Sequence, residues 1–347
     1  MTTQVSASCT MTGRLMTGRL IMGRLIPGLA LALSVMMAAG PAAAQEYPAK
    51  PVTIIVPFTA GGTADIFARL ASQHLQEKLG KPFLVENIGG AGSIIGITKV
   101  AKSVADGHVL GLGSTSGLAI NPSLYGAKLP YNPEKELIPL AQVSMVPNVL
   151  VVNPDKIKAR SVPDLIAYLK ANPGKASFGS AGPGTSQHLA GELFQQMTGT
   201  TMTHVPYKGS SAMLQDLLSG TIDLAFDNVP LLIPHAKTGK LVLLASATEK
   251  RAEFDPALPT VAETLPGFEA VAWHGYFAPA GTPKAVTDKL SSEILAFMTL
   301  PETQKKFREL GATPMAVNAT DFSRYVTSET TKWKKVIEAA KITADLP

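Results

Sequence analysis

Three short loops carry the residues best suited to hold an anion. Each follows a strand pattern and precedes a helix pattern, and none contains Lys or Arg: residues 58–65, 114–117 and 180–186. Small residues let backbone N–H groups approach a ligand, and the dipole at a helix amino end favours negative charge. The loops therefore predict an anion held by amides and hydroxyls. The alternative is that their Gly, Ser and Thr are ordinary turn and capping residues.

A glycine-rich segment at residues 90–96 follows a strand pattern and opens a helix pattern, as a dinucleotide-binding fingerprint does. No acidic residue ends a following strand about 20 residues on, where a ribose hydroxyl would need one. Close packing of helix on strand explains these glycines more simply. The sequence also contains no Gly-Lys-Ser/Thr phosphate loop. We therefore expect no cofactor.

The sequence does not bring together the residues of a hydrolytic or metal-dependent enzyme. The six histidines form no tight cluster, and His188 with Glu192 would supply only two metal ligands. The Gly-x-Ser-x-Gly elbow of a hydrolytic triad is missing. Asp65 and Asp227 are the remaining candidates for a general base, although each has an ordinary role at a helix start or a strand end. The main prediction is a binding protein without catalytic or metal residues, and a secreted α/β hydrolase using Asp65 or Asp227 is the alternative.

The elements that position these loops alternate between strand and helix along the chain. The apolar spacing predicts strands at residues 52–56, 83–86, 109–113, 149–152, 176–178, 201–205 and 222–226. Capping and stop residues predict helices from 63 or 65 to Gly80, at 93–103, after Ser161, at 186–199, at 211–218, after 283, at 301–310 and after a cap at Thr320. This order is typical of an α/β fold with parallel sheets covered by helices.

No low-complexity linker separates the repeats of this pattern. We therefore expect two α/β lobes, each a mostly parallel sheet flanked by helices. Domain 1 is predicted to hold residues 45–146 and 270–347, and domain 2 residues 147–269. Chain crossovers near 146–148 and 271–274 would act as hinges, and the carboxyl-terminal helices would return to the first lobe. The cleft between the lobes is then the expected ligand site.

The amino terminus has the pattern of a secretory signal. Arg14, Arg19 and Arg24 precede an apolar run of 14 residues at 26–39, and Ala42-x-Ala44 follows. We predict a signal peptide over residues 1–44, cleaved after Ala44, and a periplasmic protein. The alternative is a membrane anchor, but the run is shorter than the ~18–20 residues that cross a bilayer. A repeated Met-x-Gly-Arg-Leu pattern leaves Met1, Met11, Met16 and Met22 as possible starts.

Charge and cysteine content agree with export. The net charge of +5 falls to +2 without the three arginines of the signal, with 28 basic residues against 26 acidic ones, so the charge does not indicate a nucleic-acid partner. Cys9, the only cysteine, lies within the predicted signal. The exported chain would thus contain no disulfide and rely on its core, to which 46% hydrophobic residues contribute.

Several longer motifs resemble one known family. They are Tyr47-Pro-x-Lys-Pro51, Val56-Pro-Phe-x-x-Gly-Gly62 with Asp65, Glu86-Asn87 with Gly90-Ala-Gly92, Asp106-Gly107, Asn121-Pro-x-Leu-Tyr125, Gly179-Ser-Ala-Gly-x-Gly-Thr-Ser-x-His-Leu189, His204-Val-Pro-Tyr-Lys-Gly209, Phe226-Asp-Asn228 and Phe277-Ala-Pro-Ala-Gly-Thr-Pro283. In this order they resemble the extracytoplasmic solute receptors of tripartite tricarboxylate transporters, the Bug family. The match runs from about Tyr47 to the carboxyl end.

The resemblance implies a two-lobed periplasmic binding protein of the type II kind that closes on a small carboxylate and delivers it to membrane permease subunits. It implies a monomer with no nucleic-acid partner, and a ligand-presenting sensory protein is a further alternative. The implied ligand-binding residues are Phe58, Ala60, Gly61, Gly62, Asp65, Ser114, Thr115, Ser116, Ser180, Gly184, Thr185, Ser186 and Asp227. Within this set we expect the amides and hydroxyls of the turn at 184–186 to receive a ligand carboxylate.

Overall fold

The computed structural model describes residues 46–343. The predicted signal peptide and its cleavage site, together with Cys9, lie outside these residues. Among residues 46–343, no helix is both long and apolar enough to span a membrane.

The chain begins with three parallel strands that are connected through helices. They are β1 (Val52–Val56), β2 (Phe83–Asn87) and β3 (Val109–Ser114), in the order β2-β1-β3, and the helices are α2 (Thr63–Leu79) and α3 (Ile94–Ala101). α2 buries Phe67, Ala71 and Leu75 on one stripe, and its end is fixed by Gly80, whose φ of 68° suits glycine. The predicted strand–helix order is confirmed here.

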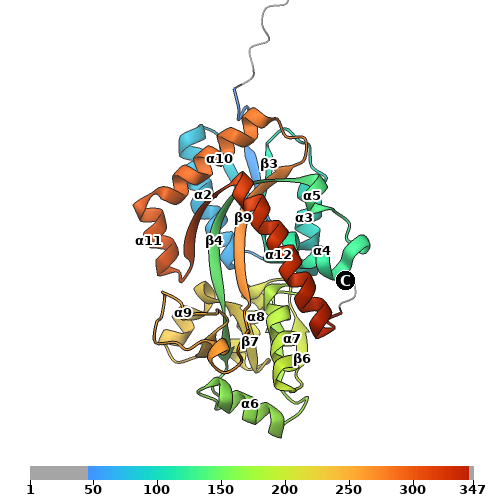
Figure 1. The fold of residues 1–347 in the computed structure, drawn as a ribbon. Helices are drawn as coiled ribbons and strands as arrows, with labels where there is room; N and C mark the ends of the chain where they lie inside the picture. Colours follow the sequence, from blue (N-terminus) through green and yellow to red (C-terminus); the bar gives the residue numbers. More distant parts are fainter. Residues whose placement is uncertain (1–45, 344–347) are drawn as a thin grey trace, which may run out of the picture. The chain divides into compact units, whose positions relative to one another are not determined.

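Two long strands, β4 (Leu137–Val152) and β9 (Val271–Pro279), run side by side through the middle of the sheet (Figure 1). They pair antiparallel from Leu137 opposite Pro279 to Pro147 opposite Val271, and β4 then pairs with β7 from Asn148 onward. The Asn148 side chain donates to Ala270 O (2.9 Å) and accepts from Asn228 (2.8 Å), which holds this change of partner in place. The two predicted crossovers therefore lie in paired strands.

We call the strands on either side of this point sheet A and sheet B. Sheet A contains β1, β2, β3, β9, β4 up to Pro147, and β10 (Thr313–Asn318). Sheet B contains β4 from Asn148 together with β7 (Leu224–Asn228), β5 (Ser177–Ser180), β6 (Thr203–Pro206) and β8 (Val242–Ser246). β1, β2 and β3 of sheet A pair parallel, as do β5, β6 and β7 of sheet B, whereas every pairing made by β4, β8, β9 or β10 is antiparallel.

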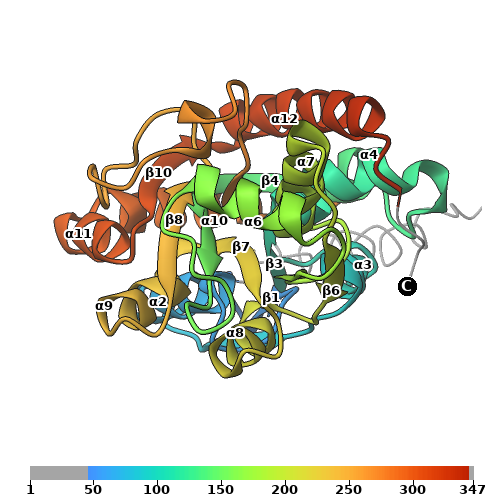
Figure 2. The same ribbon diagram turned by 90° about the horizontal axis from the view of Figure 1, so that it is seen from below.

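Helices cover both faces of the sheets. Those attached to sheet B are α6 (Val162–Ala171), α7 (Ser186–Thr198), α8 (Ser210–Ser219) and α9 (Val229–Lys237), and α12 (Ala319–Ala340) lies on the face opposite α8 and α9 (Figure 2). Shorter elements are η1 (Ala91–Ser93), η2 (Ser116–Ile120), α4 (Asn121–Tyr125), η3 (Gly126–Lys128), α5 (Pro133–Glu136) and η4 (Val261–Glu263). The predicted α/β class, with sheets flanked by helices, is confirmed.

The carboxyl-terminal helices return to sheet A. α10 (Lys284–Thr299) packs on β4 and α2, α11 (Pro301–Glu309) precedes β10, and α12 crosses β9, where Trp273 Nε1 donates to Glu329 Oε2 (3.0 Å). One detail of the prediction was wrong. Asn318, not Thr320, caps α12, because its side chain accepts from the Asp321 N–H (3.0 Å).

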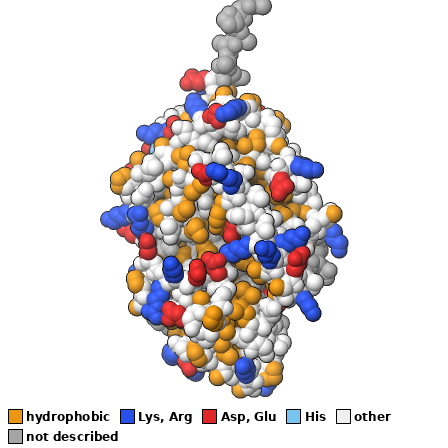
Figure 3. Space-filling view, in the orientation of Figure 1, with side chains coloured by type: hydrophobic (Ala, Val, Ile, Leu, Met, Phe, Trp, Pro, Cys, Tyr) orange, Lys and Arg blue, Asp and Glu red, His pale blue; other side chains and the backbone are white. Residues whose placement is uncertain are grey.

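The face of the molecule in Figure 3 carries charged side chains of both signs, interspersed with apolar ones. No basic stripe of the kind that follows a nucleic-acid backbone is visible on that face.

Candidate functional site

The three predicted loops meet at one small cavity of about 30 Å³. Residues from both sheets line it, and none of them is Lys, Arg, Asp or Glu. The lining residues are Phe58, Gly62, Thr63, Ala64, Ser114, Ser116, Ala181, Ser186, Gln187, Ser210, Asn228, Ala272 and His274. Of the residues predicted from the sequence, this cavity brings together Phe58, Gly62, Ser114, Ser116 and Ser186.

Helix amino ends surround the cavity. Thr63, Ser186 and Ser210 are the first residues of α2, α7 and α8, and all three line it. The first N–H groups of a helix have no partner within the helix, and the dipole makes this end positive. Because three such ends meet where no basic side chain is present, the cavity is suited to an anion bound by neutral donors.

Two hydroxyls at the cavity have no partner. The Oγ1 atom of Thr63 and the Oγ atom of Ser114 are buried and form no hydrogen bond with any of residues 46–343. A buried polar group without a partner costs about 1–3 kcal/mol. Such groups in a native structure call for an explanation, and a ligand or ordered water that accepts from them supplies one.

Ser180 and Thr185 use their hydroxyls within their own loop. Ser180 Oγ lies 2.7 Å from His204 Nε2 and accepts from the Gly182 N–H (3.1 Å). Thr185 Oγ1 donates to Gly182 O (2.7 Å) and accepts from the His188 N–H (3.3 Å) as the cap of α7. The one proton of the Thr185 hydroxyl thus has an acceptor within the loop in this structure, and the prediction that the 184–186 turn receives a ligand carboxylate stays a prediction.

The first loop is shaped by Asp65. Its Oδ2 accepts from the Gly61 N–H (2.9 Å) and from Arg69 Nε (3.0 Å). Burial alone would raise the pKa of Asp65, but these hydrogen bonds outweigh it and lower the pKa below its usual value. An ionised carboxylate paired in this way is a poor general base, and its contacts hold the loop that carries Phe58 and Gly62.

Three other predicted residues lie behind the cavity wall or at its edge. Thr115 Oγ1 accepts from the Trp273 N–H (2.9 Å), which ties η2 to β9. Ala60 O accepts from Ser211 Oγ (2.9 Å) of α8. Gly184, with a φ of 71°, lies so close to Asn121 that a Cβ there would be 2.1 Å from Asn121 Oδ1. None of the three lines the cavity.

Asp227 is fully buried next to the site. It accepts from Ser210 Oγ (2.7 Å) and from Gln187 Nε2 (3.3 Å), and both of these residues line the cavity. Burial raises the pKa of Asp227 to about 6. The contacts of Asp227 are thus those of a residue that positions two lining side chains.

Sequence reasoning missed five polar lining residues: Thr63 as a lining residue, Gln187, Ser210, Asn228 and His274. Two of them had a signal, because Thr63 and Ser210 adjoin glycines at predicted helix starts. His274 had none, because β9 was not predicted as a strand. It lies on the same face of β9 as Ala272, two residues away, as the alternation of a strand requires.

Backbones of the sheet A and sheet B parts also come close together at three glycines, of which Gly209 adjoins the lining residue Ser210. A Cβ on Gly92 would lie 1.8 Å from Pro183 O, and one on Gly89 2.9 Å from Lys208 O. A Cβ on Gly209 would lie 3.0 Å from Thr59 N. We call these three glycines the glycine seam. The expected helix–strand packing role holds for Gly96, where a Cβ would lie 2.7 Å from Pro57 Cα.

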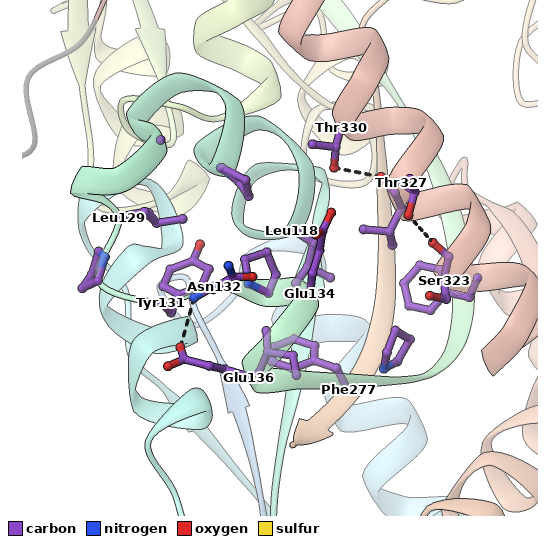
Figure 4. Close-up of a pocket in the computed structure, with 18 of the residues that line it drawn as sticks. Leu118, Leu129, Tyr131, Asn132, Glu134, Glu136, Phe277, Ser323, Thr327 and Thr330 are labelled. Carbon is purple, nitrogen blue, oxygen red and sulfur yellow. Dashed lines mark hydrogen bonds between the residues drawn. The ribbon is translucent and has the colours of Figure 1, made fainter. Parts of the chain in front are cut away.

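A larger cavity of about 980 Å³ lies between α12 and the segment from Leu118 to Pro139 (Figure 4). Its charged lining residues are Glu134 and Glu136, and the hydroxyls of Thr327 and Thr330 donate to carbonyls of their own helix. None of the residues predicted for the site lines it. Carboxylates without a basic lining residue make it unsuited to an anion. Within residues 46–343, no group of three or more metal-ligating side chains is present.

Comparison with known proteins gives a family match over most of the chain. A family model described as the tripartite tricarboxylate transporter family receptor matches residues 67–342. Protein BugT of Bordetella pertussis is 38% identical over 305 residues, which cover 86% of this chain and 92% of BugT. A protein encoded in the tcbD-tcbE intergenic region of a Pseudomonas species is 35% identical over 301 residues, covering 86% of this chain and 89% of that protein.

Solved structures of related proteins are similar to this chain in both sequence and fold. A protein of R. palustris determined with adipate is 37% identical, with a TM-score of 0.82, covering 86% of this chain and 99% of that one. The periplasmic binding protein BugD is 33% identical, with a TM-score of 0.82, covering 86% of this chain and all of that one. MatC of Rhodopseudomonas palustris with bound malate is 29% identical, with a TM-score of 0.79, covering 84% and 100%.

Proposed function

Since this chain belongs to the tripartite tricarboxylate transporter receptor family, whose members are solute-binding receptors, we propose that it captures a small carboxylate in the cavity lined by Ser114 and Ser186. The family resemblance read from the sequence motifs is confirmed by the same matches. The observation that carries the ligand class is the pair of buried, unpartnered hydroxyls of Thr63 and Ser114 among three helix amino ends.

The lining favours a carboxylate over a cation or an apolar solute. Its side chains offer hydroxyls, an amide and an imidazole, and its helix ends offer N–H groups, whereas no lining side chain carries a charge. Adipate and malate, each present in the structure of a related protein, are both dicarboxylates. Binding by neutral donors is reversible, as a receptor that releases its solute requires.

The remaining site assignments follow from contacts. Ser114, Ser116, Ser186, Phe58 and Gly62 are proposed to touch the ligand. The other predicted residues are proposed to shape the loops that carry them: Ala60, Gly61, Asp65, Thr115, Ser180, Gly184, Thr185 and Asp227. Because Asp65 and Asp227 are engaged in this way, we propose no catalytic role for either.

Delivery completes the proposed function. The receptor would act as a monomer in the periplasm and pass its solute to membrane permease subunits of a tripartite transporter. Export would use residues 1–44 as a signal peptide, so the exported protein would begin at Gln45. Mass spectrometry of the exported protein tests the last point, and a soluble form that retains Arg24 would contradict it.

A thermal-shift screen with mono-, di- and tricarboxylates tests the function. A ligand that binds only the folded state raises the melting temperature in proportion to the logarithm of its concentration over Kd. We expect at least one carboxylate to do so, with no turnover of a panel of carboxylate esters. Binding of no carboxylate, or ester turnover that is lost on replacing Asp65 or Asp227, would contradict the proposal.

A further inference from the structure

His274 lies where it can contact a ligand in the cavity. It is 3% exposed, it lines the cavity, and it comes from β9, which pairs with β3 and β4 in sheet A. In the strand register it stands opposite Ser114 of β3 on one side and Ser144 of β4 on the other. Phe67 of α2 packs against the ring edge-on at 5.6 Å. The imidazole is therefore held by packing from three strands and a helix.

The Ser144 hydroxyl determines which nitrogen of His274 carries the proton. Ser144 is fully buried, and its Oγ lies 3.0 Å from His274 Nδ1, its one side-chain hydrogen bond among residues 46–343. If Nδ1 were protonated, the Ser144 hydroxyl proton would be left without an acceptor, which is costly in a buried site. If Ser144 donates to Nδ1, both groups are satisfied. The second arrangement places the ring proton on Nε2.

The His274 Nε2–H group is then left for a ligand. Nε2 makes no hydrogen bond with any of residues 46–343, and the ring lines the cavity. His274 belongs to the sheet A part, whereas the helix amino ends of α7 and α8 belong to the sheet B part. One carboxylate received at those helix ends leaves His274 facing the other part of the same ligand.

We infer that His274 is a specificity-determining residue, held by Ser144 in the tautomer whose Nε2–H donates to a second carboxylate, so that the receptor prefers dicarboxylates to monocarboxylates of equal length. This inference rests on the proposed function, because it assumes that a first carboxylate occupies the cavity. Ser144 acts as a positioning residue, since it touches His274 and not the ligand.

Two matched acid pairs test the inference by isothermal titration calorimetry: adipate against hexanoate, and succinate against butyrate. Within each pair the two acids differ by one carboxylate. We expect the parent protein to bind one dicarboxylate at least about tenfold more tightly than its monocarboxylate partner, as one charge-assisted hydrogen bond allows. His274→Phe keeps an aromatic ring and should lose about tenfold in dicarboxylate affinity, with the monocarboxylate Kd changed less than about threefold. His274→Gln, which retains an amide donor near the Nε2 position, should restore part of the preference.

The tautomer provides a readout that does not depend on any variant folding. In ¹⁵N NMR of the parent protein, the ring of His274 should show a protonated Nε2 and an unprotonated Nδ1. In Ser144→Ala both tautomers should be populated, and dicarboxylate affinity should fall by about twofold if the populations become equal.

The measurements distinguish a failure of the proposed function from a failure of the inference about His274. If the parent binds none of the acids used here or in the thermal-shift screen, the proposed function is wrong and the inference falls with it. If the parent binds acids but shows no preference for the dicarboxylate, the inference is wrong and the proposed function stands. The same holds if His274→Phe keeps the full preference, or if Nδ1 carries the proton.

Discussion

At the scale of single residues, the site contains two kinds of hydroxyl. Those of Ser180 and Thr185 hold the 180–186 turn together, whereas those of Thr63 and Ser114 are buried with no partner among residues 46–343. The first kind therefore stabilises the fold, whereas the second kind is available to a ligand. Removing a hydroxyl of the first kind should lower the stability of the fold. Removing one of the second kind should lower only the affinity for the ligand.

Ser114→Ala should weaken binding of the best carboxylate by about 1.5–3 kcal/mol, because a hydrogen bond to a charged group is lost. Its free energy of unfolding should not fall below the parent value, since no hydrogen bond within the protein is removed and a buried hydroxyl without a partner is lost. Ser180→Ala is the control and should lose about 1–3 kcal/mol of unfolding free energy. Calorimetry and urea denaturation of both variants measure the two quantities. Equal affinity in Ser114→Ala and the parent would contradict the assignment.

Burial of His274 should also appear in the pH dependence of stability. Burial lowers its pKa from 6.5 to about 4, because the charged imidazolium is disfavoured in the interior. The unfolded chain therefore takes up this proton near pH 6.5 and the folded protein only near pH 4. The contribution of neutral His274 to the free energy of unfolding is complete above pH 6.5. It is lost as the pH falls from 6.5 to 4.

Between pH 7 and pH 4, the parent should accordingly lose about 3 kcal/mol more unfolding free energy than His274→Phe does. Urea denaturation of both proteins at the two pH values measures this difference, and other titrating groups cancel in the comparison. Parallel pH curves for the two proteins would show that His274 is not buried as described.

The sequence indicated where this chemistry lies but not which atoms perform it. Loops 58–65, 114–117 and 180–186 were predictable because glycine and hydroxyl residues between a strand and a helix are a local pattern. That the Thr185 hydroxyl donates to Gly182, and that Asp65 pairs with Arg69, depends on backbone geometry. His274 was missed because its place follows from pairing with strands more than 100 residues away in sequence.

At the scale of elements, local sequence patterns predicted the parallel strands but not the full extent of the long antiparallel ones. Each parallel strand and its helix form a local unit with its own caps, such as Gly80 and Gly199 at helix ends. β4 is longer than predicted because it continues through Pro139 and Pro147, residues that usually interrupt a strand. Its register shifts next to Pro139, which accommodates the missing N–H.

The glycine seam gives a prediction at this scale. Gly92→Ala should lower carboxylate affinity at least about tenfold, because a Cβ 1.8 Å from Pro183 O keeps the two parts from closing on the ligand. Gly80→Ala is the matched control, since Gly80 has a similar φ (68° against 56°) but no atom within 4 Å of an added Cβ. Gly80→Ala should lose about 1 kcal/mol of stability from backbone strain, and Gly92→Ala at least as much, because its Cβ also meets Pro183 O.

Calorimetric titration and urea denaturation distinguish strain from closure. If Gly92→Ala binds carboxylate as tightly as Gly80→Ala does, the contact with Pro183 is not needed for binding. The seam would then be an ordinary packing contact.

At the scale of the whole domain, the cavity is too small for the ligand to enter as the structure stands. About 30 Å³ is the volume that one water molecule occupies in the liquid, and a dicarboxylate is several times larger. We therefore expect the sheet A and sheet B parts to move apart to admit it. The point at which β4 changes partner, between Pro147 and Asn148, is the proposed hinge.

Small-angle X-ray scattering should detect this motion. The ligand-free protein should have a radius of gyration larger than that of the closed arrangement, and saturating carboxylate should reduce it, because only the closed form gives the ligand contacts from both parts. An unchanged radius of gyration at saturating ligand would argue against opening about this point.

A ligand carboxylate is proposed to occupy the cavity at the amino end of α7. The most direct test is a titration of a variant that carries a negative charge at this position. Ser186→Asp places a carboxylate at the first residue of that helix, where the dipole favours it. Because Ser186 is buried, the new carboxylate also carries a desolvation cost that the helix dipole offsets only in part, so urea denaturation must first show that the variant is folded. In the folded variant the charge would repel a ligand carboxylate. Isothermal titration with the tightest-binding acid should show a Kd raised at least about 100-fold in a fully folded protein. A Ser186→Asp variant that binds the acid as tightly as the parent would contradict the account.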